Sequence, residues 1–205
     1  GQMLRGKVFF SVNNYCEEMK NMPETNDTKL YEKIIARREV FRGKLIRVEH
    51  WDAELASGRV SLREIVKNAN AAAVVPVDAD GNVTLVRQYR AAMGEIMMEI
   101  PAGKKDSVEE DSLVCAKREL EEETGLSAQS WKLLCDARMS PGFLTEQVSI
   151  YLATGLSQGS DHPDEDEYLN VVKMPLGDAV ELVRQGKITD AKTVIGLMMA
   201  KDCLE

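Results

Sequence analysis

Hydrophobic and polar positions alternate along the first third of the chain. Between residues 31 and 66 the alternation is interrupted by turns at Gly43 and at Ser57-Gly58. Alternation with a period of two predicts half-buried strands, here at residues 34–41, 45–55 and 60–66. Short strands joined by turns in this way predict an antiparallel meander.

The middle of the chain is more continuously apolar. Residues 71–77 form a nearly unbroken hydrophobic run, which predicts a buried strand. Residues 83–89 are predicted to pair back across the turn that contains Asp80-Gly81. Further hydrophobic runs predict strands at residues 96–100, 131–137, 148–153 and 168–174.

Helical spacing replaces this pattern before Gly125 and near the C-terminus. Hydrophobic residues at positions 113, 115, 116 and 120 recur at helical intervals and stop before Gly125, which is typical of a helix that ends on a glycine cap. Similar patterns predict helices at residues 176–184 and 190–203. Together the strands and helices predict an α+β fold.

The helix before Gly125 carries four glutamates, Glu119, Glu121, Glu122 and Glu123. Glu119 shares one helix face with Glu122 and Glu123, because residues three and four positions apart are neighbours. Like charges at these spacings destabilise a helix, and a hard divalent cation such as Mg²⁺ or Mn²⁺ suits carboxylate oxygens. The alternative interpretation is a solvated acidic surface.

Length and composition limit the choice of function. The chain has 205 residues and a net charge of −8, which allows one domain with a full core and an extension. The negative charge argues against a broad basic surface for nucleic acid. The four cysteines form no CxxC motif, so neither a zinc site nor a disulfide framework is indicated. No apolar run approaches the roughly 18 residues of a membrane span, and we expect a cytoplasmic protein that binds neither nucleic acid nor membrane.

The sequence from Glu110 to Leu126 resembles the Nudix box, G-x5-E-x7-R-E-U-x-E-E-x-G-U, in which U is aliphatic. Every fixed position in this span matches. The box glycine departs from the pattern, since the motif requires it at Lys104 and the chain has Gly103. The loop after Gly103 therefore carries one extra residue.

The resemblance implies the Nudix fold, an α/β/α sandwich with a mixed central sheet. We assign this domain to residues 69–205, the antiparallel β meander to residues 31–68 and an N-terminal extension to residues 1–30. Family enzymes are homodimers that exchange N-terminal strands. The resemblance therefore implies a homodimer, to which the meander is suited.

Nudix enzymes hydrolyse nucleoside diphosphates linked to another moiety, and the resemblance implies Mg²⁺ or Mn²⁺ as the cofactor. Such an ion neutralises diphosphate oxygens and lowers the pKa of a bound water. By resemblance, the metal ligands are the carbonyl oxygen of Ala102 and the side chains of Glu119, Glu122 and Glu123. Glu121 stands at the variable position and is expected to be solvated. Arg118 and Glu110 are expected to orient the ligands through ion pairs, with a purely structural role as the alternative.

A general base is also needed, and family members commonly take it from a loop outside the box. Glu165 and Glu167 occupy that place by resemblance, within an acidic run at residues 164–167. Glu146 is the other candidate base, and Glu122 joins the catalytic residues as a metal ligand. The alternative for the acidic run is a solvated loop.

Pro141 and the sequences at residues 86–90, 99–103 and 188–193 resemble the ADP-ribose pyrophosphatase subgroup. This implies a small nucleotide substrate, ADP-ribose, which is cleaved to AMP and ribose 5-phosphate. By resemblance, the substrate-binding residues are Arg63, Glu64, Arg90, Glu99, Gly142 and Phe143. Two alternatives stay open: an enzyme for another nucleotide sugar such as GDP-mannose, and a sensor that binds ADP-ribose without cleaving it.

Overall fold

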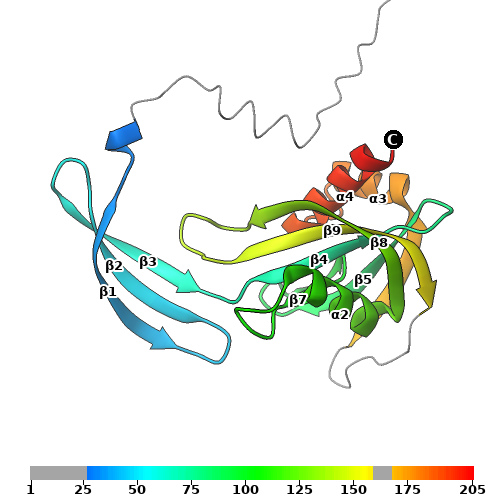
Figure 1. The fold of residues 1–205 in the computed structure, drawn as a ribbon, viewed down its shortest axis with the longest axis horizontal. Helices are drawn as coiled ribbons and strands as arrows, with labels where there is room; N and C mark the ends of the chain where they lie inside the picture. Colours follow the sequence, from blue (N-terminus) through cyan, green and yellow to red (C-terminus); the bar gives the residue numbers. More distant parts are fainter. Residues whose placement is uncertain (1–26, 159–167) are drawn as a thin grey trace, which may run out of the picture.

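The computed structural model describes residues 27–158 and 168–205, which form a slender arm and a larger body (Figure 1). Two of the predicted bases, Glu165 and Glu167, lie outside the described residues, as does most of the predicted extension. The last residues of that extension form the short 3-10 helix η1 (Asp27–Lys29).

The arm is an antiparallel sheet in the order β1-β2-β3. Its strands are β1 (Lys33–Arg42), β2 (Arg47–Glu54) and β3 (Val60–Lys67), which confirms the predicted meander. β2 begins two residues later than predicted, because the Gly43 N–H donates to the carbonyl oxygen of Ile46 (2.9 Å) and closes a turn.

The larger sheet of the body is mixed, as predicted, with the order β7-β4-β9-β8 and a parallel β4–β9 pair. Its strands are β4 (Ala71–Pro76), β7 (Ala102–Lys104), β8 (Leu126–Arg138) and β9 (Gln147–Gln158). Successive residues of β4 point into two different hydrophobic clusters, Ala73 and Val75 into one and Ala72 and Val74 into the other. Burial on both faces explains the continuous hydrophobic run in this strand.

A second sheet of the body is antiparallel and has the order β10-β5-β6. Its strands are β5 (Asn82–Arg90), β6 (Glu95–Glu99) and β10 (Leu169–Pro175). β6 ends at Glu99, and only Ile100 and Pro101 separate it from β7 of the larger sheet. Residues 99–103 therefore link the two sheets, and this link positions the candidate site.

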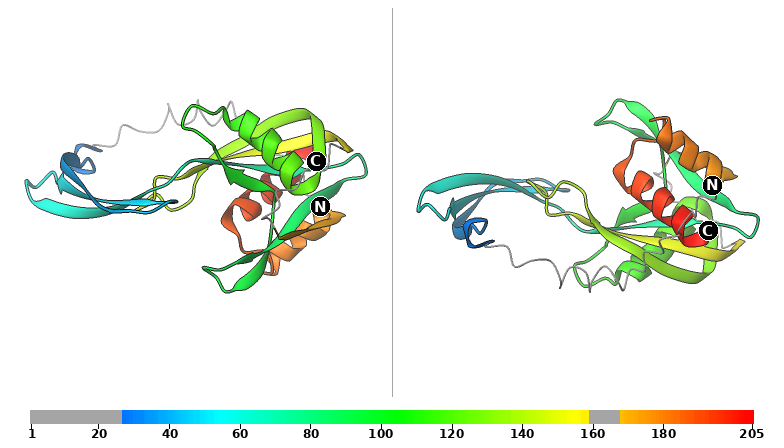
Figure 2. Two further views of the ribbon diagram at one scale, coloured as in Figure 1. Left: turned by 90° about the horizontal axis from the view of Figure 1, so that it is seen from below. Right: turned by 90° about the horizontal axis from the view of Figure 1, so that it is seen from above.

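Helices cover both faces of the larger sheet (Figure 2). α2 (Ser112–Thr124) packs on one face through Cys115, Ala116 and Leu120. α4 (Ala191–Leu204) packs on the other face beside α3 (Leu176–Arg184). This arrangement confirms the predicted α/β/α sandwich. Within the described residues, no helix has the length and apolar character needed to cross a membrane.

Two features of the larger sheet differ from the prediction. In the sequence, residues 101–103 read as a turn into the acidic helix, but residues 102–104 pair with β4 as a short edge strand. β8 and β9 are longer than predicted, since residues 126–130 pair with residues 154–158. These segments are mostly polar, so no hydrophobic pattern reveals that they are strands.

Candidate metal and substrate site

The candidate site is built on α2, whose two ends are fixed by caps. The Asp111 side chain accepts hydrogen bonds from the backbone N–H groups of Leu113 (2.8 Å) and Val114 (3.3 Å). At the other end Gly125 adopts a left-handed conformation (φ 65°), and its N–H donates to the carbonyl oxygen of Glu121 (2.8 Å). The helix therefore ends where the sequence predicted, just after the run of glutamates.

The glutamates of α2 differ in burial. Glu119 and Glu123 are buried, with 6% and 5% of their surface exposed, whereas Glu121 and Glu122 are half-buried. A buried carboxylate is stable only when charges or hydrogen bonds compensate for its lost hydration. The solvated surface, our alternative interpretation, therefore does not describe Glu119 and Glu123.

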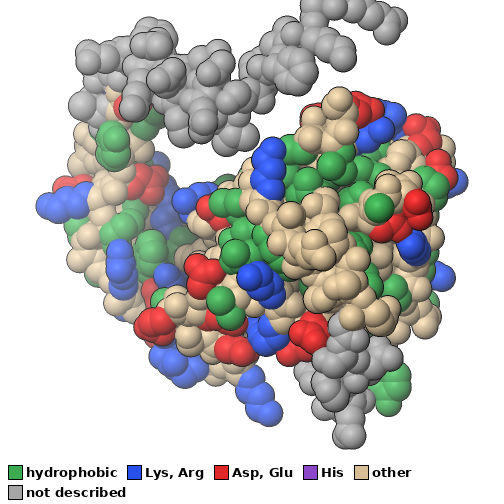
Figure 3. Space-filling view, turned by 45° about the vertical axis from the view of Figure 1, so that its right-hand side comes forward, with side chains coloured by type: hydrophobic (Ala, Val, Ile, Leu, Met, Phe, Trp, Pro, Cys, Tyr) green, Lys and Arg blue, Asp and Glu red, His purple; other side chains and the backbone are tan. Residues whose placement is uncertain are grey.

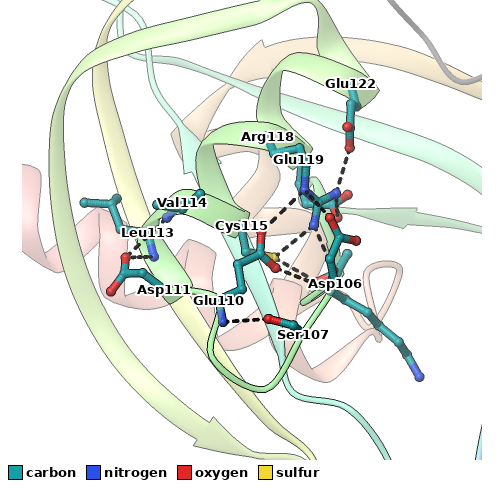
Figure 4. Close-up of polar contacts among 12 residues, drawn as sticks. Asp106, Ser107, Glu110, Asp111, Leu113, Val114, Cys115, Arg118, Glu119 and Glu122 are labelled. Atoms are coloured by element: carbon teal, nitrogen blue, oxygen red, sulfur yellow. Dashed lines mark hydrogen bonds and ion pairs between the residues drawn. The ribbon is translucent and has the colours of Figure 1, made fainter.

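Arg118 supplies part of that compensation (Figure 4). Its Nη1 donates to Glu119 Oε1 (2.7 Å) and Glu122 Oε2 (2.9 Å), and its Nη2 donates to the carbonyl oxygen of Lys104 (2.9 Å). Burial opposes the charge of this guanidinium, but the two carboxylates outweigh burial and raise the pKa of Arg118. The positions of Glu119 and Glu122 are thus tied to β7 through one arginine.

The backbone of β7 lies directly against the acidic face of α2. A Cβ atom added at Gly103 would lie 2.1 Å from the Glu119 carboxyl carbon, so the strand can approach only because residue 103 lacks a side chain. Beside it, the Ala102 N–H donates to Glu123 Oε2 (3.0 Å). Gly103 is therefore the position that requires glycine, and the extra residue lies between Gly103 and Glu110.

The loop that contains the extra residue wraps around Glu110. Glu110 Oε2 accepts from the Asp106 N–H (2.7 Å), and the Glu110 N–H donates to Ser107 Oγ (3.1 Å). Glu110 Oε1 also lies 3.6 Å from Arg118 Nε, a buried atom with no hydrogen-bond partner. The loop thus accommodates the longer spacing while its glutamate stays beside Arg118.

The acidic face has the donor chemistry of a divalent-metal site. Glu119, Glu122 and Glu123 offer hard carboxylate oxygens, and with Arg118 they form a face that is still net negative. Among residues 27–158 and 168–205, no three acidic, histidine or cysteine side chains form a compact ligand group. The reason is visible in the contacts: Glu119 and Glu122 turn toward Arg118, and Glu123 turns toward the Ala102 N–H.

Glu146, a candidate base, is half-buried and belongs to a short polar chain. Its Oε1 accepts from Asn68 Nδ2 (2.9 Å), and Asn68 Oδ1 accepts from Lys104 Nζ. Burial lowers the pKa of Lys104, and the charge of Glu146 partly opposes that shift. Glu146 is thereby linked to the strand that carries Ala102.

Arg90 and Glu99, two of the predicted substrate-binding residues, form an ion pair with each other. Arg90 forms two parallel hydrogen bonds to Glu99, from Nε and Nη2, both of 2.6 Å. Lys192 Nζ donates to the same carboxylate (2.5 Å) and to Asp190 Oδ2 (3.0 Å). Residues 188–193 carry a family resemblance, but no local pattern assigns Lys192 a role, because its partner Glu99 is distant in sequence.

The substrate-binding residues predicted on the arm stay apart from the box helix within one chain. Arg63 pairs with Glu32 of the arm (Nε to Oε2, 3.0 Å), and Glu64 Oε1 lies 3.6 Å from His50 Nε2. Phe143 and Gly142 lie in the loop after β8, where the carbonyl oxygen of Phe143 accepts from the Val66 N–H (2.7 Å). The loop is therefore joined to the base of the arm.

A hollow in the described residues lies apart from the predicted metal and substrate residues. It has a volume of about 610 Å³ and lies between the β1–β2 turn, the β3–β4 junction and the loop after β7. Its lining includes none of the predicted metal or substrate residues. We therefore place the chemistry at the buried glutamates and not in this hollow.

Comparison with known proteins identifies the family. Residues 67–195 match the family model of the NUDIX domain. The chain belongs to the Nudix family. It is 39% identical over 180 residues to an ADP-ribose pyrophosphatase of Bacillus subtilis (strain 168), with 86% of this chain and 97% of that protein covered. It is 37% identical over 172 residues to a methanol dehydrogenase activator of Bacillus methanolicus, with 82% and 92% covered.

A solved structure described as an ADP compounds hydrolase is also similar to this Nudix protein. Its TM-score is 0.74 at 28% identity, and the match covers 84% of this chain and 94% of that one. The Nudix domain and the pyrophosphatase relative identify this chain as a Nudix pyrophosphohydrolase. Enzymes of this family generally use divalent metal ions.

The close approach of β7 to the acidic face predicts that Gly103→Ala impairs this Nudix enzyme. The new Cβ atom displaces either Glu119 or the strand, and a displacement of about 1 Å typically costs about 100-fold in rate. Hydrolysis of a nucleoside diphosphate derivative with Mg²⁺ measures the effect. Gly177→Ala is the control, because a Cβ atom there meets nothing within 4 Å; equal rates for both variants would contradict the prediction.

Glu122 shares the helix face of Glu119 and accepts from Arg118, whereas Glu121 lies off that face, which predicts that Glu122→Gln and Glu121→Gln differ. Glu122→Gln keeps an oxygen that accepts from Arg118 but removes one charge from the acidic face. We expect at least about a tenfold weaker affinity for Mn²⁺ and a similar loss of activity, with an unchanged melting temperature. Glu121→Gln, the same change one residue away, is expected to have little effect. Equal Mn²⁺ affinity in the two variants refutes the ligand role of Glu122.

Proposed function

We propose that this Nudix enzyme hydrolyses ADP-ribose to AMP and ribose 5-phosphate, with Mg²⁺ as the cofactor and Mn²⁺ as a substitute. The proposal rests on one observation above all: two buried carboxylates, Glu119 and Glu123, face the backbone of Ala102 and Gly103. The similarity to the ADP-ribose pyrophosphatase of Bacillus subtilis supports the choice of substrate.

In this proposal the acidic face of α2 holds the metal. The groups that would bind it are Glu119, Glu122, Glu123 and the carbonyl oxygen of Ala102. When bound, the ion neutralises the diphosphate oxygens and lowers the pKa of a water molecule. Arg118 orients the carboxylates of Glu119 and Glu122, and Glu110 fixes the loop beside Arg118.

Arg90 is proposed to bind a phosphate group of the substrate. Glu99 engages its Nε and Nη2, which leaves Nη1 as a donor for phosphate oxygens. The Arg90 side chain is 41% exposed, so a ligand can reach it. Glu99 is 1% exposed and has both carboxylate oxygens engaged. These contacts favour a role in holding Arg90 over direct contact with the substrate.

The general base is proposed to be Glu165, Glu167 or Glu146. Glu146 accepts a hydrogen bond from Asn68. Whichever residue is the base must lie within reach of the attacking water. The three single Glu→Gln variants, assayed for hydrolysis with Mg²⁺ across pH, identify the base as the one whose loss removes the acidic limb of the pH profile. Retention of that limb in all three variants excludes this set.

We also propose that the enzyme is a homodimer, in which the arm of one copy serves the site of the other. Hydrophobic side chains are exposed on the arm, toward the left of Figure 3, where no helix of the described residues covers the sheet. The residues that are 49–54% exposed include Ile35, Val40, Phe41, Val60 and Leu62. A second copy would bury this surface and bring Arg63, Glu64 and Phe143 near a box helix.

Analytical ultracentrifugation is expected to show a particle of twice the chain mass of 22.8 kDa. Leu62→Asp places a charge on the exposed arm surface and is expected to weaken the dimer at least about tenfold. Leu204→Asp is the matched control, since Leu204 is 48% exposed on α4 and Leu62 is 49% exposed. A monomeric wild type, or equal weakening by both substitutions, would overturn the arm as the interface.

A panel of nucleoside diphosphate derivatives tests the proposed substrate. We expect ADP-ribose to be cleaved with Mg²⁺ and to have the highest kcat/KM, with AMP and ribose 5-phosphate as products identified by chromatography. Faster cleavage of GDP-mannose would instead assign the enzyme to that nucleotide sugar. Tight ADP-ribose binding without turnover of any compound would identify a sensor.

A further inference from the structure

Glu99 lies at the end of β6 and is almost completely buried, with 1% of its surface exposed. Two cations from different elements reach its carboxylate, Arg90 at the end of β5 (2.6 Å) and Lys192 in the first turn of α4 (2.5 Å). Burial disfavours the charge of Glu99, but the hydrogen bonds from Arg90 and the charge of Lys192 outweigh it and lower the pKa of Glu99.

The first turn of α4 is attached to the same short segment at a second point. Asp190 caps the helix by accepting from the Thr193 N–H (3.0 Å) and Oγ1 (2.6 Å). Thr193 Oγ1 in turn accepts from the N–H of Ile100 (2.9 Å). Adjacent residues, Glu99 and Ile100, are therefore both held by α4.

Lys192 is the charge that makes this arrangement possible. Its side chain is 13% exposed and lies between two carboxylates, Glu99 (2.5 Å) and Asp190 (3.0 Å). Without it, two buried or half-buried carboxylates would face each other with Arg90 as the remaining cation of this network. Arg90 would then be drawn toward both carboxylates and lose its parallel hydrogen bonds to Glu99.

Arg90 and Lys192 differ in how much of each side chain is exposed, and this difference distinguishes their roles. Arg90 is 41% exposed and has a free edge, whereas Lys192 is 13% exposed and is engaged on two sides. A ligand can therefore contact Arg90 directly, and Lys192 can influence a ligand only through Glu99 and Arg90.

We propose that Lys192 is a positioning residue for substrate binding: it fixes Glu99, and Glu99 fixes the guanidinium of Arg90 toward the diphosphate. This inference rests on the proposed function, because it takes Arg90 as a phosphate-binding residue. It assigns α4, on the face of the sheet opposite the box helix, a part in substrate affinity.

Steady-state kinetics of Lys192→Met and Lys192→Arg, with Mg²⁺ and ADP-ribose, test the proposal. We expect Lys192→Met to raise KM about tenfold with a smaller change in kcat, a coupling within the usual range for contacting residues. Lys192→Arg keeps the charge and is expected to recover most of the loss. Lys192→Gln replaces Lys192→Met if the methionine variant fails to fold.

The decisive comparison uses an Arg90→Met background. If Lys192 acts through Arg90, Lys192→Met changes kcat/KM less than twofold there, although it lowers the melting temperature in both backgrounds. A tenfold loss that persists without Arg90 overturns the proposal, as does an unchanged KM in the single variant. Lys173→Met is the control, since it removes a lysine ion pair of similar length, Lys173–Asp78 (2.6 Å), and is expected to leave KM unchanged.

The wild type distinguishes failure of this proposal from failure of the proposed function. If ADP-ribose is not cleaved, the proposed substrate is wrong, and the same variants are compared on the panel compound with the highest kcat/KM. The comparison remains valid because every compound of the panel contains the diphosphate that Arg90 is proposed to bind. If wild type cleaves none of them, both proposals fail.

Discussion

The contact between the acidic face of α2 and the bare backbone of β7 is the constraint on which the site depends. Two carboxylates, Glu119 and Glu123, are buried there, and burial of charge is costly without compensation. Gly103 allows the strand close enough for the Ala102 N–H to bind Glu123. The cap at Gly125 and the loop that wraps around Glu110 both help to hold α2 in this position against β7.

Two separate charge networks lie at the two ends of residues 99–103. At one end Arg118 binds Glu119, Glu122 and the carbonyl oxygen of Lys104. At the other end Glu99 binds Arg90 and Lys192. The segment between them supplies the carbonyl oxygen proposed as a metal ligand. Ion pairs to two buried carboxylates, Glu119 and Glu99, hold it on both sides. Such networks fix geometry more than they add stability.

The strands of the arm differ from those of the body in how far their hydrophobic residues are buried. Its three strands expose hydrophobic residues and are not covered by any helix of the described residues, whereas β4 is buried on both faces. Within the described part of the chain, the hydrogen bonds and ion pairs of Arg63 and Glu64 are with residues of the arm. One chain therefore keeps the proposed substrate-binding residues of the arm apart from the box helix, which is the physical basis for the proposed dimer.

The sequence by itself determined the elements whose pattern is local. The buried strand at residues 71–77, the helices at 176–184 and 190–203, and the helix that ends at Gly125 all follow from short-range periodicity and caps. The tertiary structure decided what depends on distant partners: the edge strand β7, the need for glycine at residue 103, and the meeting of Glu99 with Lys192. Residues 99 and 192 meet only when α4 packs across the sheet, and no local pattern records such a contact because charge pairing depends on distance in space and not along the chain.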